Sequence, residues 1–213
     1  FDDAYPTDDS MPNFKIEPTL TADKRDVLLE ILNEFRIVFR PSLGKTDLVT
    51  HSLHMLDTTP CVGPMYKLPE SLKQPFEQEV QRLLDEGVLV ECVSPYHSPI
   101  IPIRKADGTL RLVNNFKELN KKIRDDQYMM ADPYHIVTQA AGKRYISQLD
   151  LSKAFLQISL EKKDQHVTAW TCHLGQFMWT RLAQGLSGGP RTMQRLITIL
   201  LKGSSKFASA LQD

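Results

Sequence analysis

Residues 100–116 read IIPIRKADGTLRLVNNF, two β-prone runs on either side of a short turn. The first run covers Ile100–Lys105 and the second covers Leu110–Phe116, and the turn between them contains an Asp-Gly pair. Such a pair between β-prone runs is a strong hairpin signal, because both residues tolerate the positive φ of a tight turn. The pattern predicts a β-hairpin that carries three basic residues, Arg104, Lys105 and Arg111.

Charge is balanced over the whole chain but not along it. The 213 residues include 26 Lys or Arg and 26 Asp or Glu, so the formal net charge is zero. A neutral chain is not the usual footprint of a nucleic-acid-binding protein. Between residues 104 and 124, however, seven basic residues face two acidic ones: Arg104, Lys105, Arg111, Lys117, Lys121, Lys122 and Arg124 against Asp107 and Glu118. On charge alone, this stretch is either a phosphate-binding surface or a solvated face.

Several classes of protein are excluded by simple features of the sequence. The apolar runs are far shorter than the roughly 20 residues of a membrane span, so we expect no membrane partner. Three widely spaced cysteines, Cys61, Cys92 and Cys172, contain no CxxC pair, which argues against a zinc site or a disulfide scaffold and for reduced thiols. The chain starts at Phe1 without an initiator Met or a signal peptide, so we expect it to begin inside a longer product.

Apolar periodicity gives a coarse secondary structure. It predicts helices over residues 22–39, 74–86, 133–142 and 190–201, and strands, besides the hairpin, over 48–56, 88–90, 144–149, 167–171, 176–182 and 207–211. Thr21 is the expected N-cap of the first helix, and Pro75 is expected in the first turn of the second helix. The loop 184–190 is rich in glycine and leads into the last helix, whose predicted inward residues are Met193, Leu196, Ile197 and Leu200.

With these motifs in their order along the chain, the sequence resembles the reverse transcriptases of LTR retrotransposons, nearest to the gypsy type. The resemblance runs from about Leu20 to the last residue and rests on the set rather than on any single motif. The matching motifs are Ser94-Pro95-x-x-Ser98-Pro99, the hairpin turn Lys105–Arg111, Leu119-Asn120, Gln148–Phe155, Trp179–Leu186 and Pro190–Arg195.

The resemblance implies an α+β fold, the fingers and partial palm of a right-hand polymerase, with an antiparallel palm sheet packed on helices. It implies N-terminal helices and a connection over 19–93, fingers over 94–143 and a truncated palm over 144–213. Residues 1–18 are polar, contain three prolines and lack periodicity, so we expect them to form a linker or tail. The implied activity is RNA-directed DNA polymerisation, in which a primer 3′-hydroxyl attacks the α-phosphate of a deoxynucleoside triphosphate. Two Mg²⁺ ions, with Mn²⁺ as the alternative, are expected in a complete site.

The metal-binding and catalytic residues implied by the resemblance are Asp150, the backbone carbonyl of Leu151, and Asp213. Carboxylates suit these hard cations because they bind through oxygen. Counting on from Pro190 aligns Asp213 with the first Asp of the family's Tyr-x-Asp-Asp hairpin. A rival register makes Asp213 the second Asp and Gln212 a lost one, and we favour the first register because the run from Phe207 then falls on the preceding strand.

Further residues are implied to bind the nucleotide and the template. Either Arg104 or Lys105, together with Arg111, is expected on the triphosphate, since cationic side chains pair with phosphate oxygens. The aromatic ring of Phe155 is expected beneath the sugar, where it would select deoxynucleotides. Gln184 and Gly185 are expected to line the nucleotide pocket. The template and primer are expected on Lys117, Lys121, Lys122, Pro190 and Gln194.

Three readings of the function stay open at this point. In the first, the chain is part of a Pol polyprotein that acts in the cytoplasm before a nuclear integration step. Its partners are a template and primer, a dNTP, and the remaining palm, thumb and RNase H segments. Because the chain stops inside the expected palm, we expect it to be inactive alone. In the second, a host has retained it as a non-catalytic RNA-binding or interaction module, since Leu211 replaces the motif Tyr and Gln212 is polar. A relic without function is a third alternative.

Overall fold

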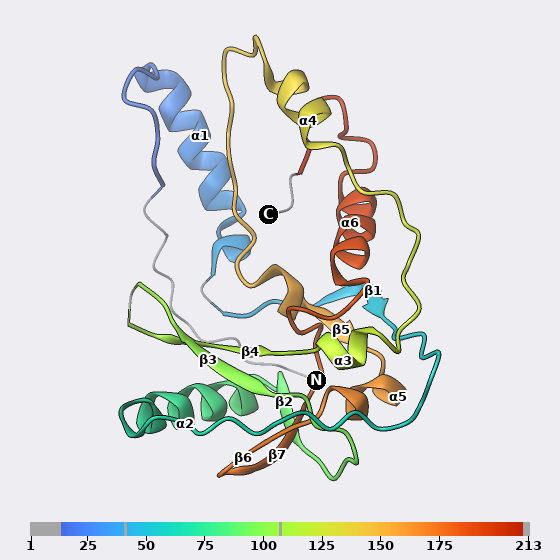
Figure 1. Ribbon diagram of the computed structural model, residues 1–213. Coiled ribbons are helices and arrows are strands. Elements are labelled where there is room, and N and C mark those ends of the chain that lie inside the picture. Colours follow the sequence, from blue (N-terminus) through green and yellow to red (C-terminus); the bar gives the residue numbers. More distant parts are fainter. Residues whose placement is uncertain (1–13, 41, 107, 211–213) are drawn as a thin grey trace. The chain divides into compact units, whose positions relative to one another are not determined.

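A computed structural model of the chain describes residues 14–40, 42–106 and 108–210 (Figure 1). The chain divides into two compact units, Phe1–Gly44 and Lys45–Asp213. In the first unit, helix α1 (Ala22–Glu34) is followed by a 3₁₀ turn, η1 (Arg36–Phe39), and Thr21 is the N-cap. The helix predicted over 22–39 is therefore confirmed, although its last turn is tightened to 3₁₀ geometry.

Among its described residues, the second unit contains three small sheets. An antiparallel sheet has the strand order β2–β7–β6, formed by Leu89–Glu91, Gly175–Trp179 and Trp170–Cys172. The predicted hairpin is present as β3 (Ile100–Arg104) and β4 (Leu110–Asn114), paired antiparallel. Strand β1 (Thr46–His51) pairs in parallel with β5 (Ile158–Leu160). The strand expected over 48–56 thus ends at His51. The pair expected over 167–171 and 176–182 is present, but its first strand begins only at Trp170, after a 3₁₀ turn, and its second ends at Trp179.

Five α-helices and two further 3₁₀ turns are described in this unit: α2 (Glu70–Asp85), α3 (Lys117–Asn120), α4 (Pro133–Ala140), α5 (Lys162–Gln165), α6 (Gly189–Leu200), η2 (Ala154–Gln157) and η3 (His166–Thr168). Within the described residues, we find no helix with the length and apolar character that crossing a membrane requires. The helices predicted over 133–142 and 190–201 are confirmed as α4 and α6. Leu200, expected to point inward from α6, is instead 54 % exposed.

Helix α2 begins at Glu70, four residues before the predicted start, so Pro75 lies inside the helix rather than in its first turn. A proline there removes one backbone hydrogen bond. The helix persists because Phe76, Val80 and Leu83 form a continuous buried face, and tertiary packing outweighs a local propensity. Its end follows the expectation, since Gly87 has a φ of +63°.

The core of the second unit is built around aromatic rings from α2 and the β2–β7–β6 sheet. Phe76 lies edge-on to Trp170, with ring centroids 6.2 Å apart, and Trp170 contacts Phe177 at 5.2 Å. All three side chains are buried. Rings of this size bury a large apolar area, and tilted or edge-to-face geometry adds a favourable electrostatic contribution.

A buried amide connects the hairpin to this sheet. The indole Nε1 of Trp179, at the end of β7, donates to Oδ1 of Asn114, at the end of β4, over 2.8 Å. Asn114 Nδ2 in turn donates to the carbonyl of Ser98 over 3.3 Å. Because a buried polar group is costly without a partner, these bonds fix the base of the hairpin beside the end of β7.

The strands predicted over 144–149 and 207–211 are wrong within the described residues. Residues 144–149 are irregular and exposed, and residues 207–210 form a turn and an irregular segment. A strand is stable only when its N–H and C=O groups pair with a neighbour. No strand in the described part of the chain pairs with either segment.

A large-to-small substitution in the core tests this packing. Phe76→Ala is expected to lower the free energy of unfolding by about 3–5 kcal/mol, because it removes a buried ring and leaves a cavity. Phe207→Ala makes the same chemical change at a side chain that is 83 % exposed, and we expect a change below about 0.5 kcal/mol. Urea unfolding of both variants measures the two values, and equal losses would contradict the packing described here.

His51 joins β1 to α6. Its Nδ1 lies 2.8 Å from Oγ1 of Thr192, and the side chain is only 3 % exposed. Burial lowers the pKa of His51 from 6.5 to about 4, because the charged ring is poorly solvated. The nearby carboxylates of Asp164 and Asp126 oppose this shift, and His54 adds to it. The imidazole is therefore neutral in the folded protein near neutral pH.

This depressed pKa predicts a loss of stability in mild acid. The unfolded chain binds a proton at His51 below pH 6.5 and the folded protein does so only near pH 4, so the stability contributed by the neutral ring is lost as pH falls through this window. The loss is expected to reach about 3 kcal/mol. We expect His51→Asn to flatten the slope of unfolding free energy against pH between 6.5 and 4. The exposed His135→Asn serves as control, and a slope unchanged in His51→Asn would contradict the assignment.

Candidate active site

The glycine-rich loop 184–190 leads from β7 into the first turn of α6. Two of its glycines have positive φ angles. Gly185 has a φ of +92° and Gly188 a φ of +75°, and Gly188 is the residue that precedes the first turn of α6. Side chains other than glycine rarely adopt these angles. The loop sequence therefore specifies the sharp turn by which the chain enters α6.

The side-chain amide of Asn120 holds this loop from α3. Its Nδ2 donates to the carbonyl of Gly185 over 2.7 Å, and its Oδ1 accepts from the amide N–H of Ser187 over 2.9 Å. Both ends of one amide are thus used on the same turn. Two such bonds fix the loop relative to the short helix that follows the hairpin.

A pocket of about 650 Å³ lies against this loop. It is lined by Arg111, Met130, Phe155 and residues 183–191. Five of the residues predicted for the nucleotide or template site meet here: Arg111, Phe155, Gln184, Gly185 and Pro190. They come from β4, η2 and the loop, so the structure brings together groups that are more than 70 residues apart in the sequence.

Arg111 lies on the exposed face of the hairpin. It pairs across the strands with Ile103, while Leu110 and Leu112 point to the buried face. Within the described residues, no hydrogen-bond acceptor or carboxylate partner is found for its guanidinium. A planar cation at the edge of a pocket is suited to phosphate oxygens, which it can bind in a bidentate manner.

Strand alternation separates the two other basic residues of the hairpin. Arg104 pairs with Leu110 and therefore lies on the face opposite to Arg111. The amide of Lys105 donates to the carbonyl of Thr109 over 2.8 Å, which continues the pairing by one residue. Lys105 therefore shares a face with Arg111, and of the two alternatives it is the one whose position favours joint binding of one ligand.

The predicted metal ligands are not assembled in the described part of the chain. Asp150 and Leu151 lie in an irregular, exposed segment before η2, and Asp213 lies outside the described residues. Among the described residues, no group of three or more His, Cys, Asp or Glu side chains gathers in metal-binding geometry. A carboxylate and a backbone carbonyl are nevertheless oxygen donors of the kind that Mg²⁺ prefers.

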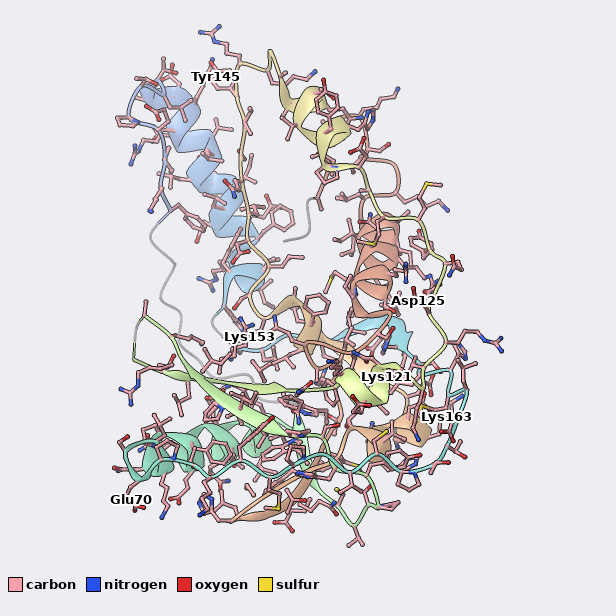
Figure 2. All side chains as sticks on the ribbon, viewed as in Figure 1. Glu70, Lys121, Asp125, Tyr145, Lys153 and Lys163 are labelled. Atoms are coloured by element: carbon pink, nitrogen blue, oxygen red, sulfur yellow. The ribbon has the colours of Figure 1, made fainter. Side chains whose placement is uncertain are left out.

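The residues predicted to contact the template have different surroundings. Lys121, labelled in Figure 2, pairs with Glu118 at 2.8 Å on an exposed surface. Lys122 pairs with Asp57 at 2.8 Å and donates to the carbonyl of Thr59, so its charge is already compensated. Lys117 is exposed, and Gln194 is 9 % exposed on the buried side of α6.

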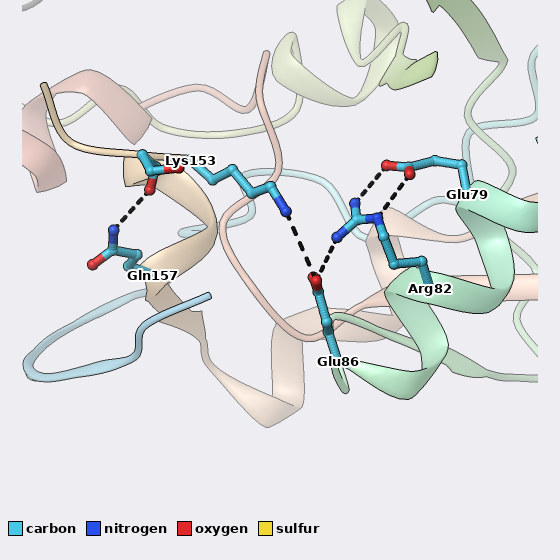
Figure 3. A network of polar contacts seen from close by, with 6 residues as sticks. Glu79, Arg82, Glu86, Lys153 and Gln157 are labelled. Atoms are coloured by element: carbon cyan, nitrogen blue, oxygen red, sulfur yellow. Dashed lines mark hydrogen bonds and ion pairs between the residues drawn. The ribbon is translucent and has the colours of Figure 1, made fainter. Parts of the chain in front are cut away.

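An ion-pair network lies beside the segment that carries Asp150 (Figure 3). Lys153 Nζ is 3.8 Å from Oε1 of Glu86, and Arg82 bridges Glu86 and Glu79 at 2.5 and 2.6 Å. Burial lowers the pKa of Lys153, and the positive charge of Arg82 lowers it further, while Glu86 raises it. Hydrogen bonding to Glu79 raises the pKa of Arg82. The segment before η2 is thus tied electrostatically to the end of α2.

Some residues that line the pocket or hold its loop were not found from the sequence. Asn120 belongs to the Leu-Asn motif, but the motif gave no indication that its amide holds a loop. Arg191 follows Pro190 in another motif, lines the pocket and pairs with Asp125. Met130 also lines the pocket. It lies in an irregular segment, and no pattern in the sequence pointed to it.

The comparisons with known proteins agree with this architecture. Residues 103–211, about half of the chain, match the family described as reverse transcriptase (RNA-dependent DNA polymerase). The retrovirus-related Pol polyprotein from transposon opus of Drosophila melanogaster is 29 % identical over 89 % of this chain, and that from transposon 412 is 27 % identical over 84 %. The Gag-Pol polyprotein of Koala retrovirus is 30 % identical over 63 %. This chain spans 20, 15 and 8 % of the length of these relatives.

Solved structures give the same fold. A foamy viral protease-reverse transcriptase in complex with an RNA/DNA hybrid matches with a TM-score of 0.77 and 23 % identity, over 91 % of this chain and 27 % of that one. A prototype foamy virus protease-reverse transcriptase matches with a TM-score of 0.78 and 24 % identity, over 87 and 25 %. The predicted α+β fold of polymerase fingers and palm is confirmed, and the chain belongs to the reverse transcriptase (RNA-dependent DNA polymerase) family.

Proposed function

We propose that this chain supplies the nucleotide-binding fingers and part of the palm of an RNA-directed DNA polymerase encoded by a gypsy-type LTR retrotransposon. The observation that carries the proposal is the pocket in which Arg111, Phe155 and the glycine-rich loop meet. Its volume of about 650 Å³ falls within the range of ligand pockets, roughly 300–1,000 Å³. The cation of Arg111 suits a phosphate, and the aromatic ring of Phe155 suits a sugar. The backbone of the glycine-rich loop suits a base.

In this proposal, the residues of the chain divide the work of holding the incoming nucleotide. Arg111 and Lys105 bind the triphosphate from the exposed face of the hairpin. Phe155 lies beneath the sugar and excludes a 2′-hydroxyl by contact. Gln184 and Gly185 position the base and sugar edge against the loop that Asn120 holds.

Asp150, the carbonyl of Leu151 and Asp213 would hold two Mg²⁺ ions, with Mn²⁺ as the alternative. Bound ions would supply activation of the primer 3′-hydroxyl and stabilisation of the leaving pyrophosphate. The carboxylate of Asp150 is exposed and is therefore accessible to the ions.

The template and primer complete the proposed complex. The exposed Lys117 and Lys121, together with Lys122, Pro190 and Gln194, are proposed to contact the nucleic acid strands. The names of the relatives support a Pol polyprotein as the context, in which the rest of the palm, the thumb and RNase H act with this segment. We propose the domain boundaries 1–18, 19–93, 94–143 and 144–213, and action in the cytoplasm before nuclear integration.

Nucleotide affinity tests the proposal directly on this chain. We expect a fluorescent dATP analogue to bind in the presence of Mg²⁺, and Arg111→Met to weaken binding by about ten-fold because it removes a charge-assisted contact to phosphate. Anisotropy titration measures the dissociation constants. Arg25→Met removes the same charge at a residue that does not line the pocket, and we expect it to have no effect.

Two results would contradict the proposed function. One is absence of nucleotide binding by the wild-type chain, and the other is equal affinity in wild type and Arg111→Met. Salt-dependent RNA binding without nucleotide binding would favour the non-catalytic RNA-binding module instead.

A second prediction concerns the loop. Asn120→Ala removes both bonds to the loop and leaves the carbonyl of Gly185 and the amide of Ser187 without these partners. We expect the free energy of unfolding to fall by about 1–2 kcal/mol and nucleotide affinity to fall with it. Asn33→Ala, on the exposed surface of α1, is the matched control. Unchanged nucleotide affinity in Asn120→Ala would show that the pocket does not need the loop to be held.

A further inference from the structure

A second cavity, of about 690 Å³, shares no lining residue with the pocket of the candidate active site. Four segments of the second unit line it: residues between 53 and 60 after β1, the turn at 95–96, Arg124, and residues between 163 and 167 in α5 and η3. None of the residues proposed for nucleotide, metal or template contact is among them. The proposed function therefore leaves this cavity without a role.

Hydrogen bonds between these segments hold the walls of the cavity in place. The amide of Arg124 donates to the carbonyl of His54 over 2.8 Å. The carboxylate of Asp164, on α5, accepts from the amide of Leu53 over 2.8 Å and from the hydroxyl of Ser52 over 3.2 Å. The segment after β1 is thus joined both to the segment after α3 and to α5. The cavity is formed without any ligand, as is usual for binding sites.

The buried residues that line the cavity are mainly apolar. Leu53, Tyr96 and Val167 all line it, and each is less than 5 % exposed. The hydroxyl of Tyr96 donates to the carbonyl of Thr58, so its polar end already has a partner. An occupant that places an apolar group against these side chains removes apolar surface from water, which favours binding.

Two cations at the cavity have no counter-charge of their own. Arg124 and Lys163, the latter labelled in Figure 2, both line the cavity and are exposed. Within the described ranges, neither side chain makes an ion pair or a hydrogen bond. Asp125 and Asp126, which follow Arg124, pair instead with two arginines of α6. The charge complement of this cavity is therefore an external anion.

We propose that this cavity docks a short acidic peptide segment of a partner protein, with an apolar side chain inside it and carboxylates on Arg124 and Lys163. The volume exceeds what one side chain needs, so the occupant is a segment rather than a single residue. A nucleic-acid duplex would satisfy the two cations, but it presents sugars and phosphates outward and has no apolar group to fill the cavity. The inference does not depend on the proposed function.

A labelled peptide tests this docking site on the whole chain. The probe is a fluorescein-labelled row of aspartates with one phenylalanine at its centre, titrated by anisotropy at low ionic strength. We expect Arg124→Met and Lys163→Met each to weaken binding about three-fold, because each removes an exposed ion pair. Lys162→Met removes the same charge from the neighbouring residue of α5, which does not line the cavity, and is expected to have no effect.

A second peptide, with serine in place of the phenylalanine, tests the apolar lining without altering the protein. We expect it to bind about ten-fold more weakly, because it buries less apolar surface. Equal affinity of the two peptides would reduce the cavity to a charged surface and overturn the inference. So would an equal loss in Lys162→Met, or the absence of peptide binding by the wild-type chain.

Two further titrations separate this site from the other functions considered. Single-stranded RNA that is weakened by Arg124→Met and Lys163→Met, while the peptide is not, would assign the surface to nucleic acid and overturn the inference. The fluorescent dATP analogue is expected to bind all three variants with wild-type affinity, since none of the changed residues lines its pocket. Failure of the peptide to bind therefore leaves the proposed function intact. Thermal unfolding checks that each variant is folded.

Discussion

The hydrogen bond from the indole of Trp179 to the buried amide of Asn114 connects the two parts that make the pocket. Trp179 ends β7, which leads into the glycine-rich loop, and Asn114 ends β4, which carries Arg111. This bond is buried, and the Nδ2 group of the same Asn114 amide donates to the carbonyl of Ser98. The hairpin therefore cannot shift along the sheet without leaving polar atoms unpaired. This polar contact inside an apolar core therefore contributes to the position of the basic face relative to the loop.

The loop itself depends on a second amide in the same region. Asn120 lies only six residues after Asn114, so a single short stretch of chain fixes both the end of β7 and the turn that follows it. Glycines at 185 and 188 supply the angles, but angles alone leave a loop free to choose among many conformations. The amide selects one of them. The pocket is thus a product of side-chain hydrogen bonds on a rigid element, the arrangement that gives a binding site its precision.

Local patterns predicted most of the elements but not their surroundings. The hairpin, α6 and the helix over 133–142 follow from turn chemistry and apolar spacing within a few residues, so the sequence was sufficient for them. Pro75 misled the prediction of α2, because packing of Phe76 outweighs a local rule. The strand expected over 144–149 failed for a different reason, since pairing depends on a neighbour that periodicity cannot reveal. For the site, the resemblance indicated Arg111, Phe155 and Gln184, whereas Asn120 and the pairing of Lys153 with Glu86 appear only in three dimensions.

The residues proposed for nucleotide recognition and those proposed for metal binding lie on parts of the chain with different degrees of constraint. Arg111 lies on a paired strand and Gly185 on a loop held by two hydrogen bonds, whereas Asp150 lies on an exposed irregular segment. Lys153 combines a constrained backbone with a loosely held side chain. Its backbone has a strained positive φ, whereas its ammonium group makes only a long ion pair with Glu86.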